Sequence, residues 1–207
     1  MRSGQITLEM FYLQLVLLTA FLLLQLAGCA RSMPTEYYLL ESSAKPVQTD
    51  SLPEKTLRVA RVAVPEYLDR SGIVSRIDGQ SRLVVAQFHI WAEPLSQGVR
   101  RVVREALAPL LFASGINVQR TEDGGGDLVL FLDVERFDGA IGGKARTELR
   151  WTLKNRRDVV LGQGSHAEDE PVQGKEYADL VRAQSILISR FAVRFAGLLP
   201  SLDSNSR

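Results

Sequence analysis

The sequence predicts a single α+β domain, a mainly antiparallel sheet with two long amphipathic helices packed on one face. Apolar residues recur at helical spacing in two stretches, 95–111 and 177–198. Several other stretches alternate apolar and polar residues as half-buried strands do, most regularly at 147–154. The order of these stretches is a strand, three strands, a helix, four strands and a helix. That order is typical of helices covering one face of a sheet.

The chain opens with an apolar run at 10–28 that carries no charge and follows Arg2. As a helix the run would span roughly 28 Å, close to the thickness of a bilayer core. It ends in Leu26-Ala27-Gly28-Cys29, which matches the bacterial lipobox at all four positions, and Cys29 is the only cysteine. We expect cleavage between Gly28 and Cys29, with a diacylglyceryl thioether and an N-acyl chain, such as palmitate, on Cys29. An uncleaved transmembrane anchor is the alternative, but it leaves the complete lipobox unexplained.

These features divide the chain into a signal peptide (1–28), a lipidated tether (29–36), a folded domain (37–200) and a frayed tail (201–207). Two or more acyl chains anchor a protein stably. The tether residues that follow Cys29 reach only about 23 Å when fully extended, so the domain stays close to its membrane. By analogy with lipoprotein sorting, Ala30 after the cysteine predicts the outer membrane.

The charge composition argues against nucleic acid as the partner. The formal net charge is +1, so there is no basic excess for nucleic acid and no acidic tail. With one cysteine the mature chain has no internal disulfide, and a chain of this length can bury one core.

The first half of the domain reads as strands followed by a helix. A short aromatic strand at 37–40 precedes a β-rich run at 57–64, whose alternation breaks at Arg61 and predicts a bulge there. The runs at 73–77 and 83–87 flank Asp78-Gly79, which favours a hairpin.

The first helix follows Pro94, which fits a helix start. Its apolar face is built from Leu95, Val99, Val102, Val103, Ala106, Leu107, Leu110 and Leu111. Pro109 predicts a kink, and Gly115 suits the position past the helix end.

The second half predicts strands and a terminal helix. The expected strands are 116–120, 128–134, 147–154 and 159–166, with loops at 138–143 and at the acidic run 168–170. The terminal helix follows from apolar spacing between Tyr177 and Leu198, and Pro200 should end it. We interpret both helical stripes as faces that pack on the sheet.

No residue pattern predicts catalysis or a metal site. His89 and His166 have no second ligand at metal-binding spacing, and Gly-x-Ser-x-Gly is absent. The 139–144 segment is one residue short of a phosphate loop, and Asp123 with Asp127 offers too few oxygens for calcium. We therefore predict no enzyme and no cofactor beyond the covalent lipid.

An aromatic cluster stands before the first helix, with Phe88, His89, Trp91 and Glu93 leading into Pro94. Such a cluster could be a recognition surface, because aromatic side chains contribute much binding energy. The alternative is that the aromatic residues are core and that His89 or Glu93 makes local hydrogen bonds.

Three blocks in this order resemble a known family. They are Tyr37-Tyr38-Leu39 after the lipobox, Tyr67-Leu68-Asp69-Arg70 with Ile73-Val74 and Arg76, and Trp91-Ala92-Glu93-Pro94-Leu95 with Gly98-Val99 and Arg101. The chain resembles the PqiC (YmbA-like) family, the auxiliary lipoproteins of ABC-type transport systems. The resemblance implies a non-enzymatic lipoprotein on the inner leaflet of the outer membrane, facing the periplasm. It implies partners in lipid transport: an MCE-domain protein, an inner-membrane permease, and further copies of the chain.

We expect segments 67–76 and 88–95 to converge at the sheet edge as the docking surface. Its candidate residues are Tyr67, Asp69, Arg70, His89, Trp91 and Glu93. Two alternatives are a structural lipoprotein that assists another envelope complex and a lipid-anchored envelope enzyme.

Overall fold

A computed structural model describes residues 12–20, 33–45, 53, 55–77, 80–119 and 126–204. The chain divides into two compact units, Met1–Pro34 and Thr35–Arg207. In the first unit, residues 12–20 are helical and exposed. Several predicted features lie outside the described residues: the lipobox with Cys29, the Asp78-Gly79 turn, Asp123 and the end of the tail at 205–207.

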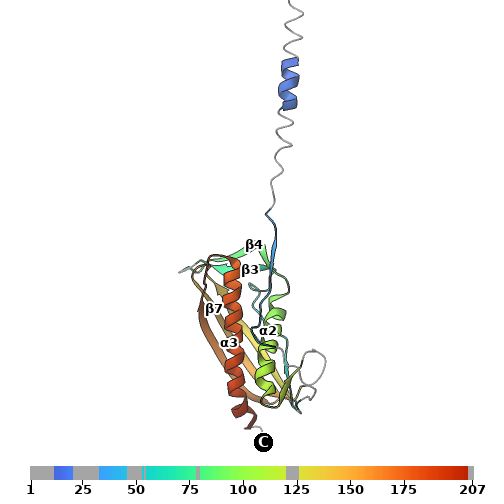
Figure 1. Ribbon diagram of the computed structural model, residues 1–207, viewed down its shortest axis with the longest axis vertical. Coiled ribbons are helices and arrows are strands. Elements are labelled where there is room, and N and C mark those ends of the chain that lie inside the picture. Colours follow the sequence, from blue (N-terminus) through green and yellow to red (C-terminus); the bar gives the residue numbers. More distant parts are fainter. Residues whose placement is uncertain are drawn as a thin grey trace, which may run out of the picture. The chain divides into compact units, whose positions relative to one another are not determined.

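The second unit is an α+β fold, as the sequence predicts (Figure 1). Its strands form two sheets instead of the one expected, in the orders β1-β4-β3 and β5-β2-β6-β7-β8. The smaller sheet consists of β1 (Glu36–Tyr38), β3 (Gly72–Arg76) and β4 (Leu83–Trp91). The larger consists of β2 (Lys55–Val59), β5 (Ile116–Val118), β6 (Leu128–Gly139), β7 (Lys144–Asn155) and β8 (Val160–Pro171).

Both sheets are mixed, because strands that are distant in the sequence pair in parallel. β1 runs parallel to β4, and β2 runs parallel to both β5 and β6. The strands that follow one another closely, β3–β4 and β6–β7–β8, pair antiparallel. Long connections, including a helix, make the parallel pairs possible.

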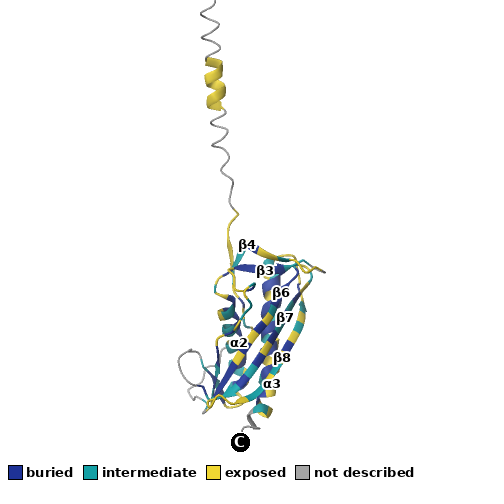
Figure 2. Cartoon of the chain, turned by 180° about the vertical axis from the view of Figure 1, so that it is seen from behind, coloured by how far each residue is buried: buried dark blue, intermediate teal, exposed yellow. Residues whose placement is uncertain are grey.

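Two helices, α2 (Leu95–Phe112) and α3 (Tyr177–Ser204), pack on each other and on the larger sheet (Figure 1). Pro94 is the residue just before α2, where its missing N–H costs nothing. In the middle of β6 and along β7, buried residues alternate with exposed or half-buried ones, which Figure 2 shows as dark blue interrupted by yellow or teal. The buried set joins both helices and both sheets in one core cluster.

The expected strand at 57–64 is interrupted near Arg61. β2 ends at Val59, and the chain then continues beside β6, where Ala60 N–H donates to the Leu130 carbonyl at 2.8 Å. Ala63 forms a single parallel bridge with Asp133. The broken alternation therefore marks an irregular strand, in which the consecutive residues Val59 and Ala60 are both buried.

Three boundaries predicted in the second half are wrong. Asp138 and Gly139 belong to β6, because the Asp138 carboxylate is held by arginines and does not face a solvated loop. Residues 168–170 belong to β8, where Asp169 lies opposite Arg146. α3 continues past Pro200 to Ser204, because Leu202 packs against Gly162 of β8.

One described helix, Tyr177–Leu202, is long and apolar enough by composition to cross a membrane. Its buried side chains belong to the core cluster, among them Leu187, Phe191 and Phe195. This is the packing expected of a core helix, in agreement with the interpretation of its apolar stripe.

Candidate functional site

The smaller sheet brings the segments 67–76 and 88–95 together. Gly72 lies opposite Ile90, and Trp91 N–H donates to the Ser71 carbonyl at 2.7 Å. A Cβ at Gly72 would overlap the carbonyl oxygen of Ala86, so only glycine fits where the register of β3 and β4 shifts. The backbones therefore converge as the sequence predicts.

Tyr67 and Arg76 lie beside a buried carboxylate of the larger sheet. Arg76 Nε and Nη2 each donate to Asp138 at 2.9 Å, and Arg136 donates to the same carboxylate at 3.1 Å. Tyr67 Oη donates to the Glu135 carbonyl at 3.4 Å. Since Asp138 is fully buried and Arg76 comes from β3, this ion pair joins the two sheets.

The charges of this cluster shift two pKa values. Burial acts to raise the pKa of Asp138, but the hydrogen bonds from Arg76 and Arg136 outweigh it and hold the pKa below its usual value. Burial also raises the pKa of Tyr67, and the nearby Asp138 charge adds to the rise. Asp138 is therefore a permanent anion and Tyr67 a neutral phenol at neutral pH, and neither is poised for proton transfer.

Glu93 faces the protein and holds Arg101 of α2. Arg101 Nε and Nη2 donate to Glu93 Oε1 at 3.0 and 2.6 Å, and Nη2 also donates to the Leu40 carbonyl at 2.8 Å. A Cβ at Gly98 would lie 3.2 Å from Glu93 Oε1, so the glycine leaves room for the carboxylate. We call the Glu93, Arg101 and Leu40 contact the α2 latch, because it ties the segment after β1 to α2.

His89 belongs to a polar cluster at the start of α3. Its ring stacks on Tyr177 with centroids 4.2 Å apart, and its Nδ1 lies 3.0 Å from Tyr38 Oη and 3.4 Å from Glu36 Oε2. Because the Tyr38 hydroxyl donates its one proton to Glu36, the His89–Tyr38 contact is a hydrogen bond in the forms of His89 that carry a proton on Nδ1. Burial, followed by the hydrogen bond to Glu36, raises the pKa of Tyr38 to about 12.

The remaining candidates divide between core and surface. Trp91 is 8 % exposed and belongs to the core cluster. Asp69 and Arg70 are exposed in a turn that begins with Leu68 N–H donating to the Pro65 carbonyl. Within the described residues, neither of their side chains has an ion-pair partner. Of the six sequence candidates, all of which the structure describes, Asp69 and Arg70 are the two classed as exposed.

The residue pattern and fold have known relatives. The family model of the ABC-type transport auxiliary lipoprotein component matches residues 37–196. The chain belongs to this family. The resemblance inferred from the three sequence blocks is therefore confirmed, and family membership points to a non-enzymatic, envelope-associated role in transport.

Two crystal structures share the fold of this auxiliary lipoprotein. One, described as an uncharacterized protein, is 24 % identical, covers 81 % of this chain and 99 % of its own, and has a TM-score of 0.67. The other, protein XCC0632 from Xanthomonas campestris, is 19 % identical, covers 83 % of this chain and 98 % of its own, and has a TM-score of 0.65. A comparison with curated proteins gave no match.

The blocks that carry the resemblance are largely structural in this auxiliary lipoprotein. Glu93, Gly98 and Arg101 form or accommodate the α2 latch, and Arg76 holds Asp138. Sequence reasoning missed Asp138 as a buried anion. Its one signal was an arginine two residues earlier in the same strand.

The described residues contain no group of three metal-ligating side chains. His166 is buried, with its Nε2 3.5 Å from Glu168 and its ring against Phe191 at 5.5 Å between centroids. Burial lowers the pKa of His166, which keeps the ring neutral inside the protein. This histidine is a packed residue of β8 and does not line an open site.

Proposed function

We propose that this auxiliary lipoprotein is acylated on Cys29, lies on the inner leaflet of the outer membrane, and docks an MCE-type lipid conduit from the inner membrane. The observation that carries the proposal is a complete lipobox just before a domain that the auxiliary family model matches from residue 37. Acylation supplies the membrane attachment, and the domain supplies the protein surface. An inner-membrane permease and further copies of the chain complete the proposed assembly.

The attachment is tested by mass spectrometry of the mature amino terminus after expression in a bacterium that processes lipoproteins. We expect a chain that begins at Cys29 with a diacylglyceryl group and an N-acyl chain. The variant Cys29→Ser should lose the lipid and keep residues 1–28 as an uncleaved precursor, because cleavage before residue 29 follows lipidation of the cysteine. An unmodified amino terminus in the parent protein would refute the anchoring.

The docking surface that we propose centres on the turn with Asp69 and Arg70, beside the half-buried Tyr67. These are the sequence candidates whose charged groups face solvent, whereas Glu93 and His89 are engaged inside the domain. Rim charges act mainly on the rate and specificity of association.

The double variant Asp69→Ala with Arg70→Ala should weaken binding to the MCE-domain protein roughly tenfold, since each exposed contact typically contributes about 1 kcal/mol or less. A matched control is Arg156→Ala with Asp158→Ala, which also removes one charge of each sign from an exposed turn. Equal affinity of both variants and the parent, measured by biolayer interferometry, would remove the turn from the docking surface.

A further inference from the structure

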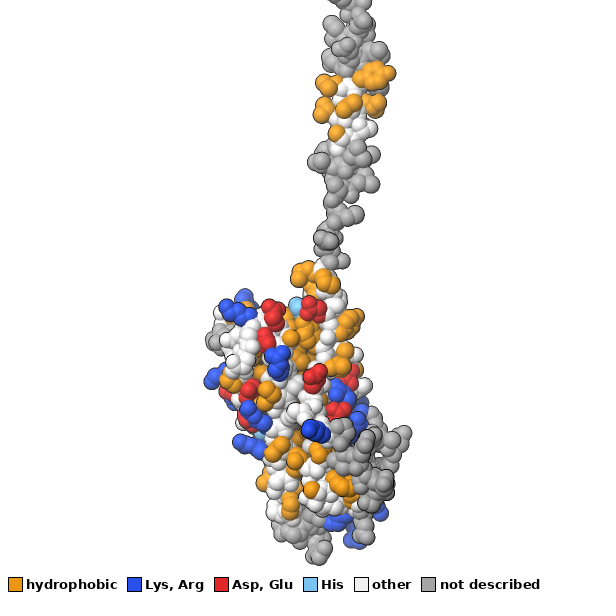
Figure 3. All heavy atoms as spheres, in the orientation of Figure 1, with side chains coloured by type: hydrophobic (Ala, Val, Ile, Leu, Met, Phe, Trp, Pro, Cys, Tyr) orange, Lys and Arg blue, Asp and Glu red, His pale blue; other side chains and the backbone are white. Residues whose placement is uncertain are grey.

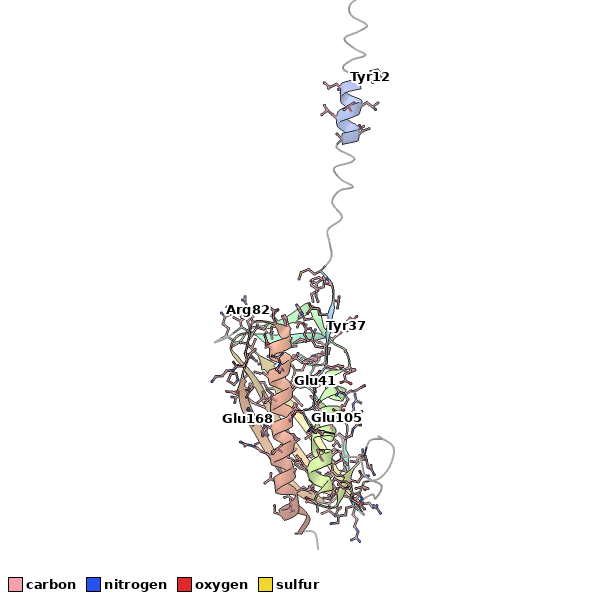
Figure 4. The ribbon with its side chains drawn as sticks, viewed as in Figure 1. Tyr12, Tyr37, Glu41, Arg82, Glu105 and Glu168 are labelled. Atoms are coloured by element: carbon pink, nitrogen blue, oxygen red, sulfur yellow. The ribbon has the colours of Figure 1, made fainter. Side chains whose placement is uncertain are left out.

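β1 and the residue that follows it carry two large exposed apolar side chains. Tyr37 is 68 % exposed and Leu39 is 49 % exposed, whereas Leu40, on the other side of the segment, is buried. In Figure 4 the labelled Tyr37 side chain projects away from the domain, and Figure 3 shows hydrophobic side chains at this end. We name this surface, formed by Tyr37 and Leu39, the β1 rim.

A shallow groove of about 410 Å³ continues from the β1 rim onto α3. Its apolar lining includes Ala178, Val181 and Ile186. The two serine hydroxyls on α3 are already paired: Ser185 Oγ donates to the Val181 carbonyl and accepts from Glu41 N–H, and Ser189 Oγ donates to the Ser185 carbonyl. The groove also has polar residues at its border, among them Glu41, Ser43 and Arg182, and Ser43 is exposed. An open groove of this mixed lining suits a broad surface contact better than a buried polar ligand.

We propose that the β1 rim rests in the headgroup region of the membrane that anchors the chain, an inference that depends on the acylation of Cys29 proposed above. Tyr37 is the eighth residue after Cys29 in the sequence, so it can lie at most about 26 Å from the anchored residue. No other large exposed apolar residue of the second unit is so near the anchor along the chain.

The side chains of the β1 rim are of the types found at membrane–water interfaces. A tyrosine places its ring among apolar groups and its hydroxyl in water, and it is enriched at membrane–water boundaries. Leucine contributes apolar area that is released from water on contact.

The charges near the rim favour a zwitterionic lipid surface. Glu36 and Glu41 are exposed at this end, and Lys45 is the exposed cation of the same segment. On α3, Arg182 is paired with Asp179 at 2.9 Å. Among the described residues around the rim, no basic cluster of the kind that attracts anionic lipids is present.

The test uses the full acylated protein in phosphatidylcholine vesicles. Cys29 is the only native cysteine and is blocked by the lipid, so Tyr37→Cys can be labelled alone with a nitroxide. The control is Val159→Cys, which is 53 % exposed in the turn between β7 and β8. That turn lies toward the carboxyl end of α3, a helix about 42 Å long whose amino end lies beside β1.

We expect vesicle binding to reduce the collisions of label 37 with a water-soluble nickel chelate and to raise its collisions with oxygen. Label 159 should show neither change. Adding Leu39→Asp should restore nickel access at position 37, while circular dichroism shows an intact fold. Replacing part of the phosphatidylcholine with phosphatidylglycerol should not increase the protection.

The outcomes separate the two proposals. A protein that floats with the vesicles but leaves label 37 as accessible as label 159 refutes the rim contact and leaves the anchoring intact. Protection of label 37 that appears only after an MCE-domain protein is added would also refute it, because a protein would then cover the rim. A protein that does not float refutes the anchoring, and the rim contact fails with it.

Discussion

At the scale of single residues, the fold depends on the carboxylate of Asp138. The sequence predicts a solvated loop at this position. Asp138 is fully buried and accepts hydrogen bonds from Arg76 of β3 and from Arg136 of its own strand. The two guanidinium groups remain partly exposed, so water still solvates the positive side of the cluster. The single buried charge is therefore well compensated, and its loss would leave two arginines facing a neutral group.

Asp138→Asn should lower the free energy of unfolding by about 2–4 kcal/mol, because it removes the charge of a buried ion pair and keeps the shape. Urea denaturation followed by circular dichroism measures this change. Asp158→Asn is the control, since Asp158 is exposed and its ion pair with Lys154 contributes within about 0.5 kcal/mol. Equal losses in the two variants would contradict the structural role of Asp138.

His166 should make stability depend on pH. Burial lowers its folded-state pKa below the ordinary value of about 6.5, so the unfolded chain takes up the proton first as the pH falls. The stabilisation is present above about pH 6.5, the ordinary histidine pKa, and is lost progressively as the pH falls toward the lowered folded-state pKa. Denaturation between pH 5 and 8 should show this decrease in the parent protein and in His89→Gln, and a smaller one in His166→Gln. A parallel decrease in all three proteins would assign the effect to other groups.

At the scale of elements, two local features position the strands of the smaller sheet. The α2 latch joins the segment after β1 to the first helix, and Gly72 lets β3 approach β4 where their register shifts. Both features use residues close in sequence to the strand or helix that they position. They account for Glu93, Gly98 and Arg101 without assigning them to a binding surface.

Glu93→Gln should cost about 1 kcal/mol of stability, because it replaces a charge-assisted acceptor of two Arg101 N–H groups by a neutral one. Chemical denaturation measures the difference. Glu105→Gln removes the same charge from the other carboxylate near Arg101, which is 3.5 Å away and more exposed, and should change stability by less than about 0.5 kcal/mol. A larger effect at Glu105 would contradict the latch.

Gly72→Ala should destabilise the domain by about 1–3 kcal/mol, because the new methyl group meets the backbone of β4. Gly197→Ala offers a matched comparison, since nothing lies within 4 Å of its Cβ position in α3. It should stabilise the helix by about 0.5–1 kcal/mol. Thermal melting of both variants tests the prediction, and a stable Gly72→Ala protein would show that the strands can separate there.

At the scale of the whole molecule, the sequence predicts what is local and misses what is distant. The helical stripes and the β3–β4 hairpin follow from periodicity and turn residues within short windows. The pairing of β1 with β4 cannot be predicted in this way. Their paired residues lie about fifty positions apart, and the periodicity of a strand does not indicate which strand it pairs with. Because periodicity does not identify strand partners, the sequence also did not predict that the strands form two sheets instead of one.

In the candidate site, too, the local features could be predicted from the sequence and the distant contacts could not. The convergence of segments 67–76 and 88–95 was predictable, because the hairpin places them side by side. The directions of the side chains were not predictable. Glu93 points to Arg101 in the next helix, and Trp91 points into the core. The acidic run in β8 looked like a loop because its cations, Arg146 and Arg190, come from β7 and α3.

The placement of β1 has a mechanical consequence for a chain held at its amino end. If Cys29 is acylated and the domain docks a partner as proposed, tension between them enters the domain through Glu36–Tyr38, a three-residue strand at the edge of its sheet. The next connection along the chain is Leu40, whose carbonyl is held by Arg101. A pull strong enough to strip β1 would be borne next by Arg101 of α2, which holds the Leu40 carbonyl, and by the Leu40 side chain, which is packed in the core. The edge strand would therefore detach before any load reaches the core.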